Sequence, residues 1–335
     1  MNSRPSDRDP AGAPVQIRRR RLAIAIGLFA PILLIWFAAA TMVARGLQFP
    51  PALAYSSAGA PAPGKPVATD PRSLPELLGT SSTEIGFRRI GAQPLIGWLA
   101  PATPEKAAVV LVYPNRIDAL AMVSYFRVIR SAGYAALIID DTTLSVRKNQ
   151  HGDRRYGFGW DQRRDVLDAV AALRLRGVLR IAVLGVSAGA AAALFAGAED
   201  APIAAIISDS SYADVSTLLR RIPPLDSLNP LFDRTVLWEF GLMEGSAIEK
   251  IAPAKAAAKL NDRPLMVING ADDALVPPAD ARKIFATAHG PKELWIVPGA
   301  GHAAALAADP AQYAQRVSAF LTRYLGAPAA GSTAH

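Results

Sequence analysis

Short apolar runs recur along the chain from about residue 84 onward, separated by polar turns and by segments with helical spacing. Runs this short, bounded by turn residues, predict strands, and the first two of them are close enough to form a hairpin. The expected strands cover residues 84–90, 94–99, 107–112, 135–139, 181–184, 203–207, 265–268 and 294–297. Because helical segments separate most of them, the pattern predicts a mostly parallel sheet covered by helices on both faces.

Helical spacing appears between these strands. Residues 119–131 and 188–196 are expected to be helical, and Asp161 is expected to cap a helix that ends near Gly177. The sequence Asp309-Pro310-Ala311-Gln312 is a capping box with proline at the first helical position, so a further helix is expected there. Its apolar positions predict a face packed against the sheet.

The longest apolar stretch lies near the N-terminus. Leu22 to Ala44 is a run of 23 residues without a charge, preceded by four arginines at 18–21. A bilayer core needs about 20 apolar residues in a helix, whereas a cleaved signal peptide usually has about 7 to 15. The stretch therefore predicts an uncleaved signal anchor in which Pro31 is tolerated. Cleavage near Ala38-Ala39-Ala40 is the alternative.

The arginine cluster indicates the orientation, since positive residues favour the cytoplasmic side. We expect a single-pass membrane protein whose N-terminus is cytoplasmic and whose folded domain is extracytoplasmic, periplasmic if the source is bacterial. The expected organisation is a basic N-terminus at 1–21, a transmembrane anchor at 22–44, a Pro/Ala-rich linker at 45–80, a folded domain at 81–326 with a helical cap at about 212–262, and a disordered tail at 327–335.

Composition narrows the function. The net charge is +8, but residues 1–21 hold six Arg and two Asp and so contribute +4 of it, which leaves no basic surface for nucleic acid. Cysteine is absent, which excludes disulfides and thiol nucleophiles. Four histidines without metal-ligand spacing predict no catalytic metal, and no cofactor is expected. His289 and His335 are expected at the surface, and His151 lies in a polar loop.

Candidate chemistry begins with Gly185-Val186-Ser187-Ala188-Gly189, which follows one apolar run and opens a helix. Small residues two before and two after Ser187 allow the strand and helix to approach closely, which exposes the hydroxyl on a sharp turn. Asp273 follows the apolar run 265–268, and His302 follows the run 294–297. Each candidate group therefore comes just after an expected strand.

The order Ser187, Asp273, His302, with a strand before each, resembles the α/β-hydrolase superfamily. The resemblance covers roughly residues 85 to 325. It implies that His302 accepts the serine proton and that Asp273 holds and stabilises the imidazole. Asp209, after the run 203–207, is the alternative acid, and Asp272 is expected to be a turn residue.

The resemblance also implies an oxyanion hole formed by backbone amides. One donor is expected to be Ala188, directly after the nucleophile. The second maps to Asn115, with Arg116 as its neighbouring alternative. Relatives usually have His-Gly before this position, whereas this chain has Tyr113-Pro114.

These features predict a membrane-anchored serine hydrolase that cleaves a carboxylic ester or a related acyl bond of a small-molecule substrate through an acyl-enzyme. A serine peptidase or a thioesterase on the same fold is one alternative. A catalytically silent hydrolase-fold binding protein at the membrane is another, and protein partners stay open. Apolar residues of the expected cap either line an acyl pocket or pack the cap itself: Leu218, Leu219, Leu231, Phe232, Trp238 and Phe240.

Overall fold

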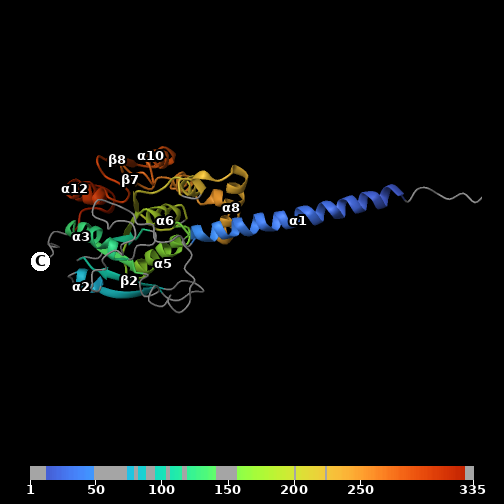
Figure 1. The fold of residues 1–335 in the computed structure, drawn as a ribbon. Coiled ribbons are helices and arrows are strands. Elements are labelled where there is room, and N and C mark those ends of the chain that lie inside the picture. The colour runs from blue at the N-terminus through green and yellow to red at the C-terminus, as the bar shows by residue number, and fades with distance from the viewer. Residues whose placement is uncertain are drawn as a thin grey trace, which may run out of the picture.

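The computed structural model describes residues 13–48, 74–78, 82–87, 95–102, 106–114, 119–140, 157–199, 201–222 and 225–328. Figure 1 shows one folded domain from which a single long helix projects. The polar loop at 142–156, with His151, and residues 329–335 of the expected tail, with His335, lie outside the described residues. Within the expected linker, the structure describes 45–48 as the end of the long helix and 74–78 as a short helix.

Eight described strands form one sheet in the order β1-β2-β4-β3-β5-β6-β7-β8. Strands β3 to β8 are mutually parallel, and β2 is antiparallel to both of its neighbours. Their bounds are β1 Thr83–Phe87, β2 Leu95–Ala100, β3 Ala107–Val112, β4 Ala135–Asp140, β5 Arg180–Val186, β6 Ala205–Asp209, β7 Leu265–Gly270 and β8 Lys292–Val297. The predicted hairpin and the parallel strands are therefore confirmed.

Helices cover the two faces of this sheet. Helices α3 and α12 pack together on one face, whereas α5 and α6 pack together on the other, where α9 and α10 continue the layer (Figure 1). Their bounds are α2 Leu74–Leu78, α3 Val123–Ser131, α5 Gln162–Leu175, α6 Ala188–Gly197, α7 Val215–Leu219, α8 Pro230–Met243, α9 Pro253–Ala257, α10 Pro278–Thr287, α11 Ala305–Ala308 and α12 Pro310–Leu325. Short 3-10 turns lie at Ala119–Met122, Leu225–Ser227 and Ile248–Lys250.

Two capping predictions had different outcomes. The Asp309 side chain accepts a hydrogen bond from the Gln312 amide at 3.0 Å, so the predicted cap of α12 is present. Asp161 stands at the cap position of α5, but its side chain makes no capping hydrogen bond. Its backbone is helical there, and a cap residue usually needs a non-helical conformation to bond the following amides.

Helix α6 is buried along its whole length. All ten of its residues are buried, and six of them are alanine. It lies between β5, β6, α5 and α9, so small side chains let these elements approach closely. The predicted region 212–262 contains α7, α8 and α9. Of these, α9 packs against α6 and α10 within the helix layer, and α8 packs against the projecting helix.

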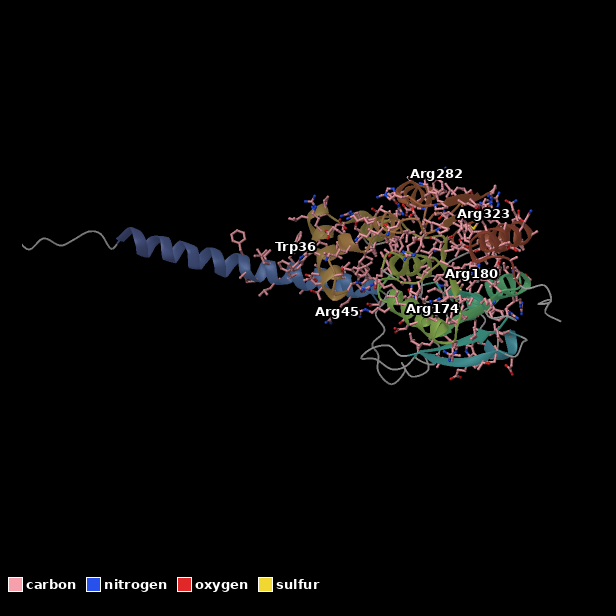
Figure 2. The ribbon with its side chains drawn as sticks, turned by 180° about the vertical axis from the view of Figure 1, so that it is seen from behind. Trp36, Arg45, Arg174, Arg180, Arg282 and Arg323 are labelled. Atoms are coloured by element: carbon pink, nitrogen blue, oxygen red, sulfur yellow. The ribbon has the colours of Figure 1, made fainter. Side chains whose placement is uncertain are left out.

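The projecting helix α1 runs from Ala13 to Gln48 and passes through Pro31 without a break. Its segment Phe29–Leu47 is long and apolar enough to cross a membrane. The part of α1 nearest the domain packs against α8. There the ring of Trp36 meets that of Phe232 edge-on, with centroids 5.0 Å apart, and the Trp36 indole N–H donates to the Thr235 hydroxyl at 3.1 Å. Figure 2 labels Trp36 where α1 meets the domain.

Candidate active site

The nucleophile candidate occupies the turn between β5 and α6. Ser187 has φ 54° and ψ −117°, a conformation that side-chain-bearing residues rarely adopt. Its amide donates to the Asp209 carbonyl at 2.8 Å, which fixes the turn against β6. A backbone strained in this way is a common property of functional turns, and here it presents the hydroxyl at the carboxyl edge of the sheet.

The two flanking glycines are required by close backbone approach. A Cβ on Gly185 would lie 2.1 Å from the Gly189 carbonyl oxygen, and a Cβ on Gly189 would lie 2.3 Å from the Val112 carbonyl oxygen. Both distances are shorter than any real Cβ contact. The turn can therefore exist in this form only with glycine at both positions, as the sequence predicted.

The three groups predicted to act together meet at this edge. The Ser187 hydroxyl lies 2.9 Å from Nε2 of His302, and Nδ1 of His302 lies 2.8 Å from Oδ2 of Asp273. The Asp273 side chain is fully buried, and that of His302 is 11% exposed. Burial strengthens the interaction between carboxylate and imidazole, because little water competes for either group.

The second oxygen of Asp273 is held by the backbone. Oδ1 accepts hydrogen bonds from the amides of Leu275 and Val276, at 3.1 and 2.7 Å. The loop that carries these amides is tied to β7 by Asn269, whose side-chain amide donates to the carbonyls of Gly270 and Val276. Sequence reasoning did not single out Asn269. Its sequence signal is a polar residue directly after the apolar run 265–268, in a strand that continues to Gly270.

Asp209, the alternative acid, takes a different place. It ends β6 in the core, where Oδ2 accepts from the Tyr313 hydroxyl at 3.0 Å and Oδ1 from the Ser210 hydroxyl at 2.9 Å. Burial raises the pKa of Asp209 from its ordinary value of 3.8 to about 6, although both hydrogen bonds act in the opposite direction. Burial, together with the charge of Asp209, also raises the pKa of Tyr313 well above 10.

Ser210 links this buried carboxylate to the histidine loop. Its hydroxyl accepts a hydrogen bond from the Ala303 amide, next to His302, at 3.2 Å. Both Ser210 and Ala303 have positive φ, at 58° and 55°.

Asp272, directly before Asp273, is exposed, as expected for a turn residue, and its amide donates to the Ala300 carbonyl. His289 is exposed, as predicted.

The two predicted oxyanion donors differ in what the structure describes. Ala188 is the first residue of α6 and is buried. An amide at the first position of a helix has no intrahelical acceptor, so it can serve a ligand oxygen. Asn115 and the alternative Arg116 lie outside the described residues.

Within the described ranges, no group of three or more His, Asp or Glu side chains could hold a metal ion.

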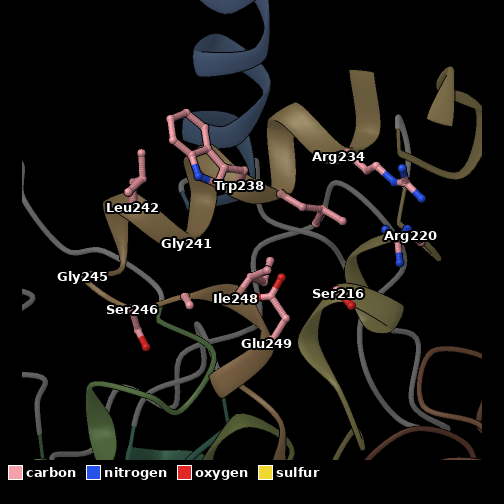
Figure 3. A pocket seen from close by; sticks show the side chains of 12 residues that line it. Ser216, Arg220, Arg234, Trp238, Gly241, Leu242, Gly245, Ser246, Ile248 and Glu249 are labelled. Carbon is pink, nitrogen blue, oxygen red and sulfur yellow. The ribbon is translucent and has the colours of Figure 1, made fainter. Parts of the chain in front are cut away.

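A cavity of about 660 Å³ lies between α7, α8 and the turn Ile248–Lys250 (Figure 3). Its walls include Trp238 and Leu242 together with Arg220 and Arg234, and no member of the triad candidates. Of the six apolar residues expected to line an acyl pocket or pack the cap, Leu218, Leu219 and Phe240 are buried in the core. Phe232 packs on Trp36, whereas Leu231 and Trp238 are exposed.

The folded domain matches a known protein family over most of its length. The model of a family described as the prolyl oligopeptidase family matches residues 124–328, which is more than half of the chain. The chain belongs to the prolyl oligopeptidase family. No curated protein sequence matches it significantly.

Solved structures similar to this prolyl oligopeptidase family member share its fold. The Pyrococcus furiosus esterase Pf2001 has a TM-score of 0.59 at 19% identity, over 78% of this chain and 100% of the esterase. The Pyrococcus horikoshii acylaminoacyl peptidase has a TM-score of 0.55 at 18% identity, over 73% of this chain and 42% of the peptidase. The dienelactone hydrolase of Anabaena variabilis has a TM-score of 0.51 at 18% identity, over 73% of this chain and 98% of the hydrolase. The predicted α/β-hydrolase fold is confirmed, and the chain is a hydrolase of this fold.

Proposed function

We propose that this chain is a membrane-anchored serine hydrolase that cleaves a carboxylic ester or a related acyl bond of a small-molecule substrate. The observation that carries the proposal is the continuous set of contacts from the Ser187 hydroxyl through His302 to Asp273, at 2.9 and 2.8 Å. Contacts of this length are within reach for proton transfer in the reaction. A serine hydroxyl needs such an adjacent base, because it is a weak nucleophile at neutral pH.

In the proposed mechanism, the Ser187 oxygen attacks the substrate carbonyl while Nε2 of His302 takes the hydroxyl proton. The resulting imidazolium is stabilised by Asp273, whose position is held by the two backbone amides on its other oxygen. His302 then donates the proton to the leaving alcohol as the carbonyl re-forms, which gives the acyl-enzyme. Water, deprotonated by His302, attacks this ester and releases the acid, and the proton returns to Ser187.

Negative charge on the carbonyl oxygen needs fixed donors during both attacks. The Ala188 amide, at the start of α6, is well suited to this, and the partial positive charge of the helix terminus adds to its effect. Asn115 is proposed as the second donor. Loss of one such donor typically costs about 3 to 4 kcal/mol in transition-state stabilisation.

Among acyl substrates, we favour esters over peptides. The alignment with the Pyrococcus furiosus esterase spans that entire chain, whereas that with the acylaminoacyl peptidase spans 42% of the peptidase. A serine peptidase is the second candidate, because the family model and this peptidase neighbour both favour it.

The proposed anchor is α1, with its arginine-rich beginning in the cytoplasm and the hydrolase domain on the other side. It is supported by the apolar segment Phe29–Leu47 and by Arg18 to Arg21 before it. A pair of reporters fused after residue 335 tests the orientation. One reporter is active only outside the cytoplasm and the other only inside it, and we expect signal from the first. Signal from the cytoplasmic reporter alone would contradict the proposal.

The first experiment treats the full chain in detergent with a fluorophosphonate probe and compares intact masses of the wild type and Ser187→Ala. One adduct on the wild type and none on the variant supports an activated serine. Turnover of matched ester, thioester and peptide substrates with the same acyl group then separates the candidate reactions. A folded wild type that gains no adduct would favour the catalytically silent binding protein instead.

A further inference from the structure

Helix α1 is longer than a bilayer requires. Its 36 residues would extend roughly 54 Å at about 1.5 Å per residue, whereas a hydrocarbon core is about 30 Å thick. Counting about 20 residues from Leu22, where the uncharged run begins, ends the span near Thr41. Trp36 then lies close to the level at which the helix leaves the lipid, the depth that tryptophan side chains prefer.

Packing against α8 begins at this same level. Beyond Trp36, the side chains of Ala40, Ala44 and Leu47 are buried, at 0%, 0% and 4% exposure. Alanines four residues apart share one helix face and allow a neighbouring helix to approach closely. Helix α8 is therefore fixed beside α1 where α1 emerges, and not at the end of an extended tether.

Helix α8 has an apolar face that is covered neither by α1 nor by the domain. Phe232 and Thr235 contact Trp36, and Val236, Leu237 and Phe240 are buried. Met243 is half-buried against the core, and the other large apolar residues are Leu231, Trp238 and Leu242, which are 64%, 55% and 61% exposed. Spacings of seven and four residues place these three on a single face of the helix, which we call the α8 stripe.

We propose that the α8 stripe, Leu231, Trp238 and Leu242, is a membrane-docking surface that lies in the headgroup region of the bilayer beside α1. The proposal rests on the proposed anchor. Exposed apolar residues on one helix face are costly in water but stabilising in the interface, where such a helix buries its apolar face. Their occupant is lipid because the helix that carries them is fixed to the segment long and apolar enough to span the membrane.

Charge near the α8 stripe fits phospholipid headgroups. Arg234 follows Leu231 by three residues, and it lines the cavity of Figure 3 together with Trp238 and Leu242. The charged residues of the cavity wall are Arg220, Arg234 and Glu249. Arg220 is 47% exposed and pairs with Asp233 at 2.7 Å. Guanidinium groups beside exposed tryptophan and leucine match a boundary that has phosphates on one side and acyl chains on the other.

Because the chain has no cysteine, a single introduced thiol can be labelled specifically. Four full-length variants would carry a fluorophore at Leu231→Cys, Leu242→Cys, Leu34→Cys and Ala319→Cys, each reconstituted in vesicles of phosphatidylcholine and phosphatidylglycerol that contain nitroxide-labelled lipids. Leu34 is an exposed residue of α1 and reports the anchor. Ala319 is an exposed residue of α12, far from α1 in Figure 1, and serves as the water-facing control.

We expect strong quenching at Leu34, Leu231 and Leu242 and little at Ala319. At the two α8 positions a nitroxide near the headgroup should quench more than one deep in the acyl chain, since an interfacial helix lies about 5–10 Å into the boundary. Quenching at Leu34 with values at Leu231 and Leu242 as low as at Ala319 would overturn the docking surface and leave the anchor standing. Absence of quenching at Leu34 as well would overturn both proposals.

Discussion

The hydroxyl of Tyr313 donates a 3.0 Å hydrogen bond to the carboxylate of Asp209, deep in the core and 104 residues away along the chain. With Ser210 on the other oxygen, both carboxylate oxygens of Asp209 are engaged. Asp273, the proposed triad acid, lies elsewhere, with its Oδ2 2.8 Å from Nδ1 of His302. The two aspartates that compete for one role in the sequence therefore have different surroundings, and this difference can be measured.

Asparagine substitutions should separate their roles. Asp273→Asn should lower turnover by about 10⁴, because the amide favours the wrong tautomer of His302. Asp209→Asn should retain most of the activity, since the side-chain contacts of Asp209 are with the Ser210 and Tyr313 hydroxyls and its backbone contact with Ser187 is unchanged. Steady-state kinetics of both variants with one ester substrate provide the measurement. Equal losses in the two variants, with both still folded, would contradict the assignment of Asp273.

Stability should depend on pH through Asp209. Its pKa is raised to about 6 in the folded state, so between pH 3.8 and 6 the folded protein binds more protons than the unfolded chain. Stability contributed by this group is present below about pH 3.8 and is lost as the pH rises through 6. The total is about 3 kcal/mol, from roughly two pKa units at 1.36 kcal/mol each.

Urea unfolding in detergent of the wild type and Asp209→Asn, from pH 3.5 to 7.5, tests this. Relative to the variant, which cannot ionise at this position, the wild type should become less stable as the pH rises. Parallel stability curves for the two proteins would show that Asp209 ionises as easily in the folded state as in the unfolded one.

Replacement of Ser187 by glycine should stabilise the protein, because it relieves backbone strain. The positive φ of Ser187 is a conformation that costs about 1–3 kcal/mol for a residue with a Cβ, and glycine adopts it freely. Ser187→Gly should therefore melt about 2–4 °C above Ser187→Ala for each kcal/mol regained in a domain of this size. Both variants lack the hydroxyl, so the comparison isolates the backbone. A melting temperature of Ser187→Gly below that of Ser187→Ala would contradict the strain.

Gly189→Ala should damage the turn that carries Ser187. The new Cβ would lie 2.3 Å from the Val112 carbonyl oxygen and 2.6 Å from that of Tyr113, and backbone must move to relieve both contacts. Overpacking of this kind typically costs about 1–3 kcal/mol. Gly86→Ala, where nothing lies within 4 Å of the added Cβ, is the matched control. Thermal melting and turnover should both fall in Gly189→Ala alone.

The proposed donor at Asn115 can be tested through its backbone. Asn115→Pro removes the amide N–H, whereas Asn115→Ala retains it, so only the proline variant should lose about 10² to 10³ in turnover. Circular dichroism confirms that each variant is folded before its kinetics are compared. A similar loss in both variants would instead implicate the Asn115 side chain.

The sequence predicted the sheet and the meeting of the three triad candidates at its edge, because both depend on local pattern. Apolar runs such as 265–268 form strands regardless of their partners, and parallel strands bring Ser187, Asp273 and His302 to one edge. The partners of Asp209 were not predictable in this way. Tyr313 stood out only as one of several apolar positions of its helix, and no pattern connects it to a carboxylate 104 residues away.

The contact between α1 and α8 could not be predicted from the sequence either, because no local pattern connects residues so far apart in the chain. Trp36 and Thr235 are 199 residues apart, and the composition of 45–80 indicated a tether between anchor and domain. Local composition describes the freedom of the connecting chain, but it carries no information on whether the two ends dock. Here the surfaces of two distant helices decide the arrangement.

That docking determines what the hydrolase can reach. A domain on a loose tether sweeps a volume whose radius follows from the tether length, whereas a domain fixed through Trp36 and Phe232 keeps one height and one tilt above the bilayer. With α1 as the proposed anchor, the proposed nucleophile Ser187 would search for substrate in two dimensions, by lateral diffusion in the membrane. On this arrangement a change in the length of 49–73 would leave the working distance from the membrane unchanged, whereas a change in the packing of one aromatic pair would alter it.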